Sequence, residues 1–353
     1  MMRRCIALIG LLFASLSYGA LPVWFGSPNA QRVLYINSTL DMSSFRPILE
    51  RFVERNPDVR IGYVDINTLE LYYSTVADSA KPTASLILSS AMDLQLKLVN
   101  DGFTRSYQSE EVGRLPNRAK WRDEVFAFSY EPVVMMVNKN AFMGVDIPQD
   151  RQGLLSYIRQ NDEQVSGRMG TYDIRTSGVG YLLASQDARQ ADATWGRMLE
   201  AFGSHGVRTY CCSSSIIDDV ASGELVVGYN LLGSYAAQRA AEDPNLEMII
   251  PKDYTLMLMR TAVIPKNAVN VQDAGRFLDF LLSDEGQALM TSEELLYPIR
   301  PSQNASQFAL PLGPTRTIRT VDLDQQLLVG RDLVKQRRFI RSWELALELS
   351  SGD

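Results

Sequence analysis

The stretch ELVVGYNLLGSYA, residues 224–236, carries the clearest structural signal in the chain, because a short apolar run in it gives way to small and polar residues. Residues 225–227 predict a buried strand, since a brief apolar run bounded by glycine is typical of one. Asn230, Ser234 and Tyr235 follow, where we expect the backbone to turn. They fit two roles equally well: capping and packing of the next helix, or lining a surface that binds a ligand.

The first part of the chain alternates predicted strands and helices. We expect strands at 32–37, 59–66 and 84–88, with amphipathic helices between them. Such alternation predicts a parallel sheet, and ligands of these sheets bind beyond the carboxyl ends of the strands. The polar residues that fall at these ends are Asn37, Ser38, Thr39, Ser89 and Ser90. We therefore expect them to face a ligand.

The middle of the chain repeats this arrangement. A strand that begins at residue 170 is followed by Thr176, Ser177 and Gly178 at the start of a predicted helix. Hydroxyl groups and free backbone N–H groups at a helix N-terminus favour anions, because the helix dipole is positive there. This turn is a candidate anion cradle.

Two long extended runs, 124–137 and 256–264, are interpreted as strands that cross between two domains. The sequence thus predicts an α/β protein of two lobes, each a mostly parallel sheet flanked by helices, joined by crossing strands. Residues 20–128 and 262–353, with the C-terminal helices, form lobe 1, and residues 129–261 form lobe 2. The polar strand ends of both lobes then face one cleft.

Residues 1–19 have the layout of a secretory signal peptide, with Arg3 and Arg4 before an apolar stretch that ends in small residues. We expect export to the periplasm and a mature chain that begins near Ala20. The apolar stretch falls short of the about 20 residues of a membrane span, and no later segment of that length lacks charges. We therefore expect a soluble protein that is not embedded in a membrane.

The composition limits the domain organisation and the kinds of partner that we expect. The 353 residues and 46% hydrophobic content suit two domains with cores of their own. The chain has 35 Lys and Arg against 41 Asp and Glu, a formal charge of −6, and loss of Arg3 and Arg4 with the signal peptide makes it −8. Such an acidic chain argues against a nucleic-acid partner.

Six segments occur in a recognisable order: the polar loop at 35–39, SSAMDLQ, FSYEPVVMMVNKNAF, TSGVGYLL, VASGELVVGYN and AGRFLDFLLSDEGQ. In this order they resemble the type 2 periplasmic solute-binding proteins of ABC importers, in the branch with ferric-ion-binding and sugar-phosphate-binding proteins. The resemblance covers residues 32–300. It implies a binding protein whose lobes close about a hinge on a small solute, and which then docks on a membrane permease.

The resemblance also bears on the ligand. Iron-binding members of the branch use two adjacent tyrosines with a histidine and a carboxylate, whereas the matching region here offers only Tyr235, and loop 37–39 offers no His or Glu. His205 lies between glycines in a predicted surface turn. Ferric binding is therefore disfavoured, and we expect no metal and no cofactor. The donors at 176–178 and Asn230 remain, and they suit a small organic anion, either a phosphate ester or a carboxylate.

Three arginines are candidate partners for the charge of such an anion. Arg260, Arg175 and Arg300 each lie beside a predicted strand end or turn. A guanidinium group matches the geometry of carboxylate and phosphate. A surface salt bridge is the alternative role for each of them.

The adjacent Cys211 and Cys212 are the two cysteines of the predicted mature chain. In an oxidising compartment they could form a vicinal disulfide at the cleft or remain thiols. Adjacent side chains of an extended segment point to opposite faces, and the small ring is strained, so geometry favours thiols.

Three functions compete. A transport receptor for an ABC importer permease is favoured, and a ligand-sensing accessory protein for the membrane sensor kinase of a two-component system is the alternative. An enzyme is disfavoured, because no glycine-flanked nucleophilic serine, no histidine placed as a base and no cluster of metal ligands is evident.

Overall fold

The computed structural model describes residues 21–78, 84–292, 296–300 and 317–348. The predicted signal peptide, residues 1–19, lies outside the described residues.

The first lobe is built on a parallel sheet. Its elements are β1 (Val23–Phe25), β2 (Arg32–Ser38), α1 (Met42–Arg55), β3 (Val59–Asp65), α2 (Thr68–Ala77), β4 (Leu86–Ser89), α3 (Met92–Asn100), α4 (Glu110–Gly113) and β5 (Lys120–Trp121). β2 pairs in parallel with β3 and β4, as the alternation predicts. Alternate residues of β2, Leu34 and Ile36, are buried in one core with Phe45 and Phe52 of α1, because strand side chains alternate between the two faces.

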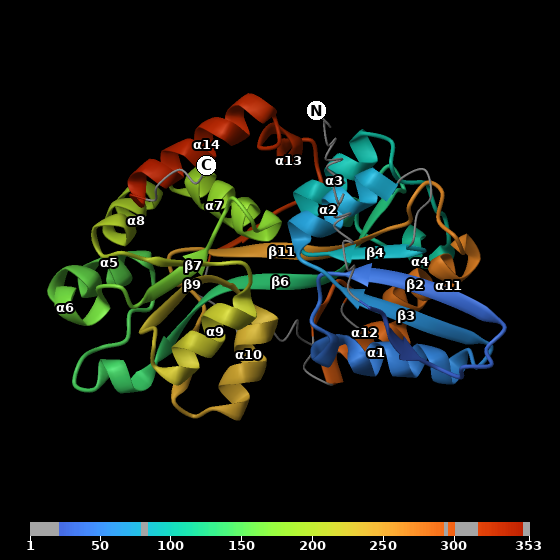
Figure 1. Ribbon diagram of the computed structural model, residues 1–353, viewed down its shortest axis with the longest axis horizontal. Coiled ribbons are helices and arrows are strands. Elements are labelled where there is room, and N and C mark those ends of the chain that lie inside the picture. Colours follow the sequence, from blue (N-terminus) through green and yellow to red (C-terminus); the bar gives the residue numbers. More distant parts are fainter. Residues whose placement is uncertain (1–20, 79–83, 293–295, 301–316, 349–353) are drawn as a thin grey trace, which may run out of the picture.

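The second lobe has helices on both faces of its strands (Figure 1). Its elements are α5 (Arg151–Gln160), α6 (Asp162–Val165), β7 (Met169–Tyr172), α7 (Gly178–Gln190), α8 (Asp192–Ser204), β8 (Arg208–Tyr210), α9 (Ser213–Ser222), β9 (Val227–Leu232), α10 (Gly233–Glu242) and β10 (Leu246–Ile249). β7 pairs in parallel with both β8 and β9.

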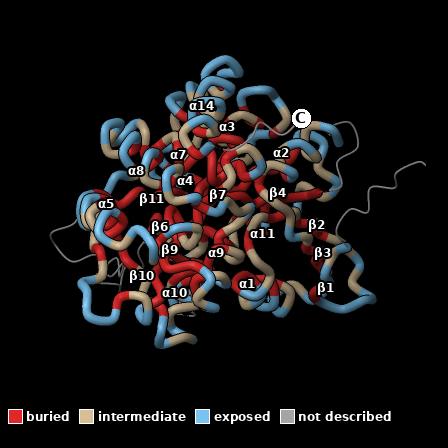
Figure 2. The backbone as a smooth tube through the Cα atoms, turned by 60° about the vertical axis from the view of Figure 1, so that its left-hand side comes forward, coloured by how far each residue is buried: buried red, intermediate tan, exposed pale blue. Residues whose placement is uncertain are grey.

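Two long strands, β6 (Val125–Asn138) and β11 (Thr255–Val263), join the lobes. They pair with each other in antiparallel fashion, and β11 continues to β4 while β6 continues to β9. The strand order β1-β3-β2-β4-β11-β6-β9-β7-β8 therefore runs through both lobes. Every residue of the two strands is buried, and Figure 2 shows them at the centre of the molecule. The two-lobed α/β architecture with crossing strands is confirmed.

The C-terminal elements are divided between the lobes. They are α11 (Val271–Leu282), α12 (Asp284–Ser292), β12 (Tyr297–Pro298), β13 (Ile318–Thr320), α13 (Gln326–Val329) and α14 (Leu333–Ala346). Phe277 of α11 packs on Phe52 in the first lobe, with ring centroids 4.8 Å apart. Trp343 of α14 instead belongs to the second-lobe core together with Trp195 of α8. The predicted division gave 262–353 to the first lobe, because an amphipathic helix does not reveal which core it covers.

The stretch 224–236 forms a strand and a helix, but the turn expected at Asn230 is wrong. β9 continues through Leu232, and α10 begins at Gly233 without an intervening loop. Asn230 adopts a left-handed conformation, with φ at 60°, beside a shift in the pairing of β9 with β6. A Cβ atom on Gly233 would lie 2.7 Å from the Pro132 ring, so the close approach that this glycine permits is made by β6.

Candidate functional site

The lobes touch where α2 meets α7, above the crossing strands in the view of Figure 1, and where the start of α1 meets α10, below them. Above, the Thr68 hydroxyl of α2 accepts hydrogen bonds from the N–H groups of Gly178, at 2.9 Å, and Val179, at 3.2 Å, in α7. Below, the Tyr235 hydroxyl of α10 accepts from the Asp41 N–H group, at 3.2 Å. The interface therefore unites helix starts from opposite lobes.

The start of α7 is the predicted anion cradle, and a neutral oxygen from the first lobe fills part of it. Ser177 is buried and caps α7 by accepting from the Gly180 N–H group at 3.2 Å. Gly178 donates to Thr68, whereas the Thr176 side chain is exposed. Ser177 and Gly178 thus lie at the lobe interface, as expected, with Thr68 as their partner.

The start of α10 is bound by an internal carboxylate. Glu131 of β6 accepts from the Ser234 N–H group at 2.7 Å and from the Ser234 hydroxyl at 2.9 Å. It also accepts from Nε of Arg260 at 2.7 Å. Burial lowers the pKa of Arg260, but Glu131 and Tyr235 together outweigh that effect and hold the pKa above its ordinary value. Ser234 and Arg260 are therefore brought together, around an internal anion.

One nitrogen of the buried Arg260 guanidinium is left without a hydrogen-bond partner in the described chain. Within the described residues its Nη1 atom has no hydrogen-bond partner, and neither has the Ser129 hydroxyl, although both side chains are 0% exposed. The two residues are cross-strand neighbours in the β6–β11 pairing. Arg260 Cζ lies 5.1 Å from the centroid of the Tyr235 ring. An unpaired buried polar group costs about 1–3 kcal/mol, which makes these two groups the best candidates for contacting a solute.

The polar strand ends of the first lobe organise its turns. Ser38 and Ser89 each accept a hydrogen bond from the backbone N–H two residues further on, at 3.0 and 3.1 Å. The Ser90 N–H group donates to the Thr39 hydroxyl at 3.2 Å, so the ends of β2 and β4 are tied together. These four residues lie next to the Tyr235 contact, because the Tyr235 hydroxyl is 3.5 Å from the Thr39 carbonyl oxygen.

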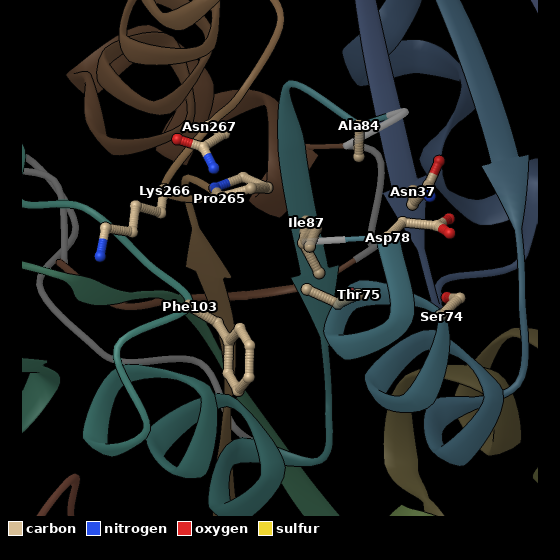
Figure 3. A pocket seen from close by; sticks show the side chains of 10 residues that line it. All are labelled: Asn37, Ser74, Thr75, Asp78, Ala84, Ile87, Phe103, Pro265, Lys266 and Asn267. Atoms are coloured by element: carbon tan, nitrogen blue, oxygen red, sulfur yellow. The ribbon is translucent and has the colours of Figure 1, made fainter. Parts of the chain in front are cut away.

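Asn37 is separated from these residues. Its side chain lines a cavity inside the first lobe, together with Asp78, Phe103 and Lys266, as Figure 3 shows. Ser38 is buried on the other face of β2, since successive side chains of a strand point to opposite faces. The structure therefore does not bring Asn37 into the lobe interface.

Asn230 supports the interior of the second lobe. Its amide donates to the Asp187 carboxylate at 2.8 Å. The same carboxylate accepts from the hydroxyls of Tyr229 and Tyr254, at 2.8 Å each, and from Arg151 at 3.1 Å. All four polar partners of Asp187 are buried, so Asn230 has a network of its own and is not placed with the residues of the lobe interface.

Two carboxylates that the sequence reasoning missed lie beside the Tyr235 contact. Asp41 precedes α1, and Asp65 ends β3. Burial raises the pKa of Asp41, although the charge of Arg260 opposes this. The pKa of Asp65 rises to about 7, because partial desolvation of its carboxyl group and the charge of Asp41 both disfavour the ionised form. The residue as a whole is exposed. Both follow strand ends, so the strand-end rule could have found them.

The other two candidate arginines have partners outside the interface. Arg175 pairs with Asp173 at 2.8 Å, and Arg300 pairs with Glu111 at 2.7 Å. Both therefore have the alternative role of salt-bridge donors.

Cys211 and Cys212 are free thiols in this structure. Cys211 is exposed, and the Cys212 sulfur lies 3.2 Å from the Ser215 hydroxyl oxygen. Burial and contact with Cys212 raise the pKa of the Cys211 thiol.

In the part of the chain that the structure describes, no three His, Cys, Asp or Glu side chains are grouped to hold a metal ion. His205 lies away from the interface, with Nε2 at 3.0 Å from Asp162. A single tyrosine, Tyr235, follows β9 at the lobe interface.

Residues 81–326 match the family described as bacterial extracellular solute-binding protein. The chain belongs to this family. Accordingly it is a type 2 periplasmic binding protein and the solute-binding component of an ABC transporter, a class that is not normally enzymatic and that works with a permease. In the described residues of this solute-binding protein, no helix is both long and apolar enough to cross a membrane.

Solved structures agree with this assignment. The substrate binding protein of the ABC transporter from Agrobacterium tumefaciens is 35% identical, with a TM-score of 0.87 over 94% of this chain and 100% of that one. AfuA from Actinobacillus pleuropneumoniae, with fructose-6-phosphate bound, is 19% identical, with a TM-score of 0.74 over 91% and 100% of the chains. A ferric binding protein from Campylobacter jejuni is 18% identical, with a TM-score of 0.67 over 89% and 98%. The last two support the fold alone.

A curated relative from Haemophilus influenzae, described as an uncharacterized protein, is 21% identical over 92% of this solute-binding protein and 93% of its own length.

Proposed function

We propose that this protein is a periplasmic receptor whose lobes close on a small anionic solute, a phosphate ester or a carboxylate, for delivery to an ABC importer permease. The observation that carries the proposal is the buried guanidinium of Arg260, whose Nη1 atom has no hydrogen-bond partner among the described residues. A buried cationic donor gains most from a negatively charged acceptor, since charge-assisted hydrogen bonds are about twice as strong as neutral ones.

The position of Arg260 suits a closing motion. It lies on β11, a crossing strand, beside Ser129 of the other crossing strand and under the ring of Tyr235 from the second lobe. Tyr235 in turn contacts Thr39 and Asp41 of the first lobe. A solute on Arg260 is therefore within reach of both lobes, and a ligand with more contacts in the closed form shifts the population toward it.

The comparison with AfuA supports a phosphate ester, since that protein was solved with fructose-6-phosphate. Iron is not proposed, although ferric-binding proteins share the fold. The Tyr235 hydroxyl is engaged with the backbone of Asp41 and Thr39, and no three His, Cys, Asp or Glu side chains of the described residues are grouped to hold a metal ion.

A binding screen tests the proposal. The purified mature protein is titrated calorimetrically with fructose 6-phosphate, 3-phosphoglycerate, citrate, succinate, sorbitol and ferric citrate, and its melting temperature is measured with each. We expect one anionic class to bind and to raise the melting temperature, because a ligand of the folded state stabilises it. Binding of sorbitol or ferric citrate alone would contradict the anionic assignment.

We also infer that residues 1–19 direct export, that 20–128 and the later segment from residue 262 through α12 form one lobe, and that 129–261 form the other, on which α14 packs through Trp343. N-terminal sequencing of the protein recovered from the periplasm checks the first point, with Ala20 or a close neighbour expected as the first residue. Limited proteolysis that releases a folded fragment ending near residue 128 would contradict the division, because the first lobe needs its later segment.

A further inference from the structure

Carboxylates of both lobes lie near the Tyr235 contact. Asp41 and Asp65 belong to the first lobe, and Asp218 of α9 in the second lobe is close enough for its charge to act on Asp41, as does the charge of Arg260. Within the described residues, neither Asp41 nor Asp65 has an ion-pair partner within 4.0 Å. Asp218 has only a loose pair, 3.7 Å from an exposed Arg239.

The side chain of Asp41 is not used to hold its own helix. Asp41 occupies the N-cap position of α1, yet its carboxylate makes no capping hydrogen bond. The carboxylate that interacts with the backbone of Met42, at the helix start, is that of Asp65. Since aspartate at an N-cap normally accepts such a bond, the Asp41 carboxylate is left available for another donor.

The charges of the cleft do not favour a simple anion. Glu131 already compensates the positive charge of Arg260 through a buried pair with the two side chains 2.7 Å apart. Asp41 then adds negative charge near the same guanidinium, and Asp65 adds negative charge near Asp41. A like charge nearby disfavours an incoming anion. Arg260 nevertheless has the buried, unpartnered Nη1 atom, which requires an acceptor. Within the described chain, Arg260 therefore lacks an acceptor for its Nη1 atom, while the nearby carboxylates are available to accept from a donor.

We propose that the solute is a zwitterion, with an anionic group on Arg260 and Ser129 and a primary ammonium group held by Asp41 and Asp65. This rests on the proposed function and narrows its ligand class. An ammonium offers three N–H donors and no acceptor, which matches two carboxylates, and a phosphate or carboxylate offers only acceptors, which matches the guanidinium and the hydroxyl. Tyr235 links the two groups of residues, because its hydroxyl accepts from the Asp41 N–H group and its ring lies 5.1 Å from Arg260 Cζ.

Matched pairs of probes test the inference, because they differ only in an amine or an alcohol. Phosphoethanolamine is compared with 2-hydroxyethyl phosphate, and aspartate with malate, by calorimetric titration of the mature protein at pH 7.5. The amine of at least one pair is expected to bind at least about tenfold tighter than its alcohol, because hydrogen bonds between an ammonium and a carboxylate are about twice as strong as neutral ones.

Three variants assign the preference to the carboxylates. Asp41→Asn and Asp65→Asn should remove the preference for the amine and leave the alcohol bound as well as before or better. Asp146→Asn, which makes the same change on an exposed loop, should keep the wild-type preference. Circular dichroism and melting temperature show whether each variant is folded.

The two proposals fail in different ways. If alcohols bind as tightly as amines, or if only fructose 6-phosphate or citrate binds, the zwitterion is wrong and the anionic receptor stands. An amine preference that survives in both Asp→Asn variants also overturns the role of the carboxylates. If none of the anions and zwitterions binds, the anionic receptor is wrong and this inference with it.

Discussion

Single residues at the centre of the crossing strands are the most informative part of the molecule. Ser129, Glu131 and Arg260 are all 0% exposed, on strands whose every residue is buried. An apolar strand pair would serve a hinge as well, and a buried ion pair is weak evidence for stability, because desolvation offsets its attraction. The polar atoms at these buried positions are better accounted for by the proposed solute, which would contact them.

Replacement of Ser129 by alanine separates a structural role from a binding role. The Ser129 hydroxyl has no partner within the described chain, so Ser129→Ala should leave the free energy of unfolding unchanged or raise it by about 1 kcal/mol. Affinity for the solute should fall about fivefold to tenfold, one neutral hydrogen bond being worth about 1 kcal/mol. Urea denaturation and calorimetry measure both. Ser156→Ala, on the solvent side of α5, is the control. A loss of stability without a loss of affinity in Ser129→Ala would contradict the binding role.

Asp65 should make stability depend on pH. Its pKa rises from 3.8 to about 7 on folding, so the folded state prefers the protonated carboxyl. The stabilisation is present below the unfolded pKa and is lost as pH rises from about 4 to about 7. Asp41, the Met42 backbone and, through its own raised pKa, Tyr63 are the groups that interact with Asp65. The melting temperature should fall between pH 5 and pH 8 in the wild type, and fall less in Asp65→Asn. Equal slopes would show that Asp65 does not titrate in this range.

At the scale of elements, the helix starts that resemble anion sites already have internal partners. The α7 start donates to Thr68, and the α10 start donates to Glu131. A helix N-terminus needs acceptors whether or not a ligand is present. Residue type and spacing identified both starts correctly as polar and interfacial, but could not tell a ligand from a residue of the opposite lobe or of a crossing strand.

Replacement of Thr68 tests whether the contact above the crossing strands holds the lobes together. Thr68→Val keeps the shape of the side chain but removes the acceptor for two N–H groups, so the free energy of unfolding should fall by about 1–2 kcal/mol. Thr68→Ser keeps the hydroxyl and should cost less. Urea denaturation of both variants gives the comparison. If Thr68→Val and Thr68→Ser have the same free energy of unfolding, the hydrogen bonds of the hydroxyl do not stabilise the contact between the lobes.

The sequence was sufficient for those features that are local. Periodicity located the parallel strands and both crossing strands, because burial on both faces leaves long apolar runs such as 125–138. It misjudged what depends on distant partners. Asn37 and Ser38 are adjacent but lie on opposite faces of β2, and Asn230 meets Asp187 through the folded second lobe. Asp41 and Asp65 come together only when β2 and β3 pair.

At the scale of the whole molecule, the C-terminal segment forms a third connection between the lobes. Arg331, only 6% exposed, donates to the Asp93 carboxylate of α3 at 2.7 Å and to the Gly178 carbonyl of α7 at 3.3 Å. The Tyr181 hydroxyl of α7 donates to the Gly330 carbonyl at 2.5 Å. Figure 1 shows α13 and α14 arching over the upper side of the molecule, with α13 against α3 and α14 against α8.

This connection should limit how far the lobes open. The double variant Asp93→Asn/Arg331→Gln removes both charges at once, which avoids the cost of about 3–5 kcal/mol for leaving one buried charge alone. Without solute, its radius of gyration in small-angle scattering should exceed that of the wild type, because the upper contact between the lobes is weakened. With a saturating solute the two proteins should match, since closure then depends on the solute as well. The exposed pair on the first lobe provides the control, in the variant Lys97→Gln/Asp101→Asn, which should leave the radius unchanged. A double variant at Arg331 that stays as compact as the wild type without solute would mean that the two crossing strands alone set the range of motion.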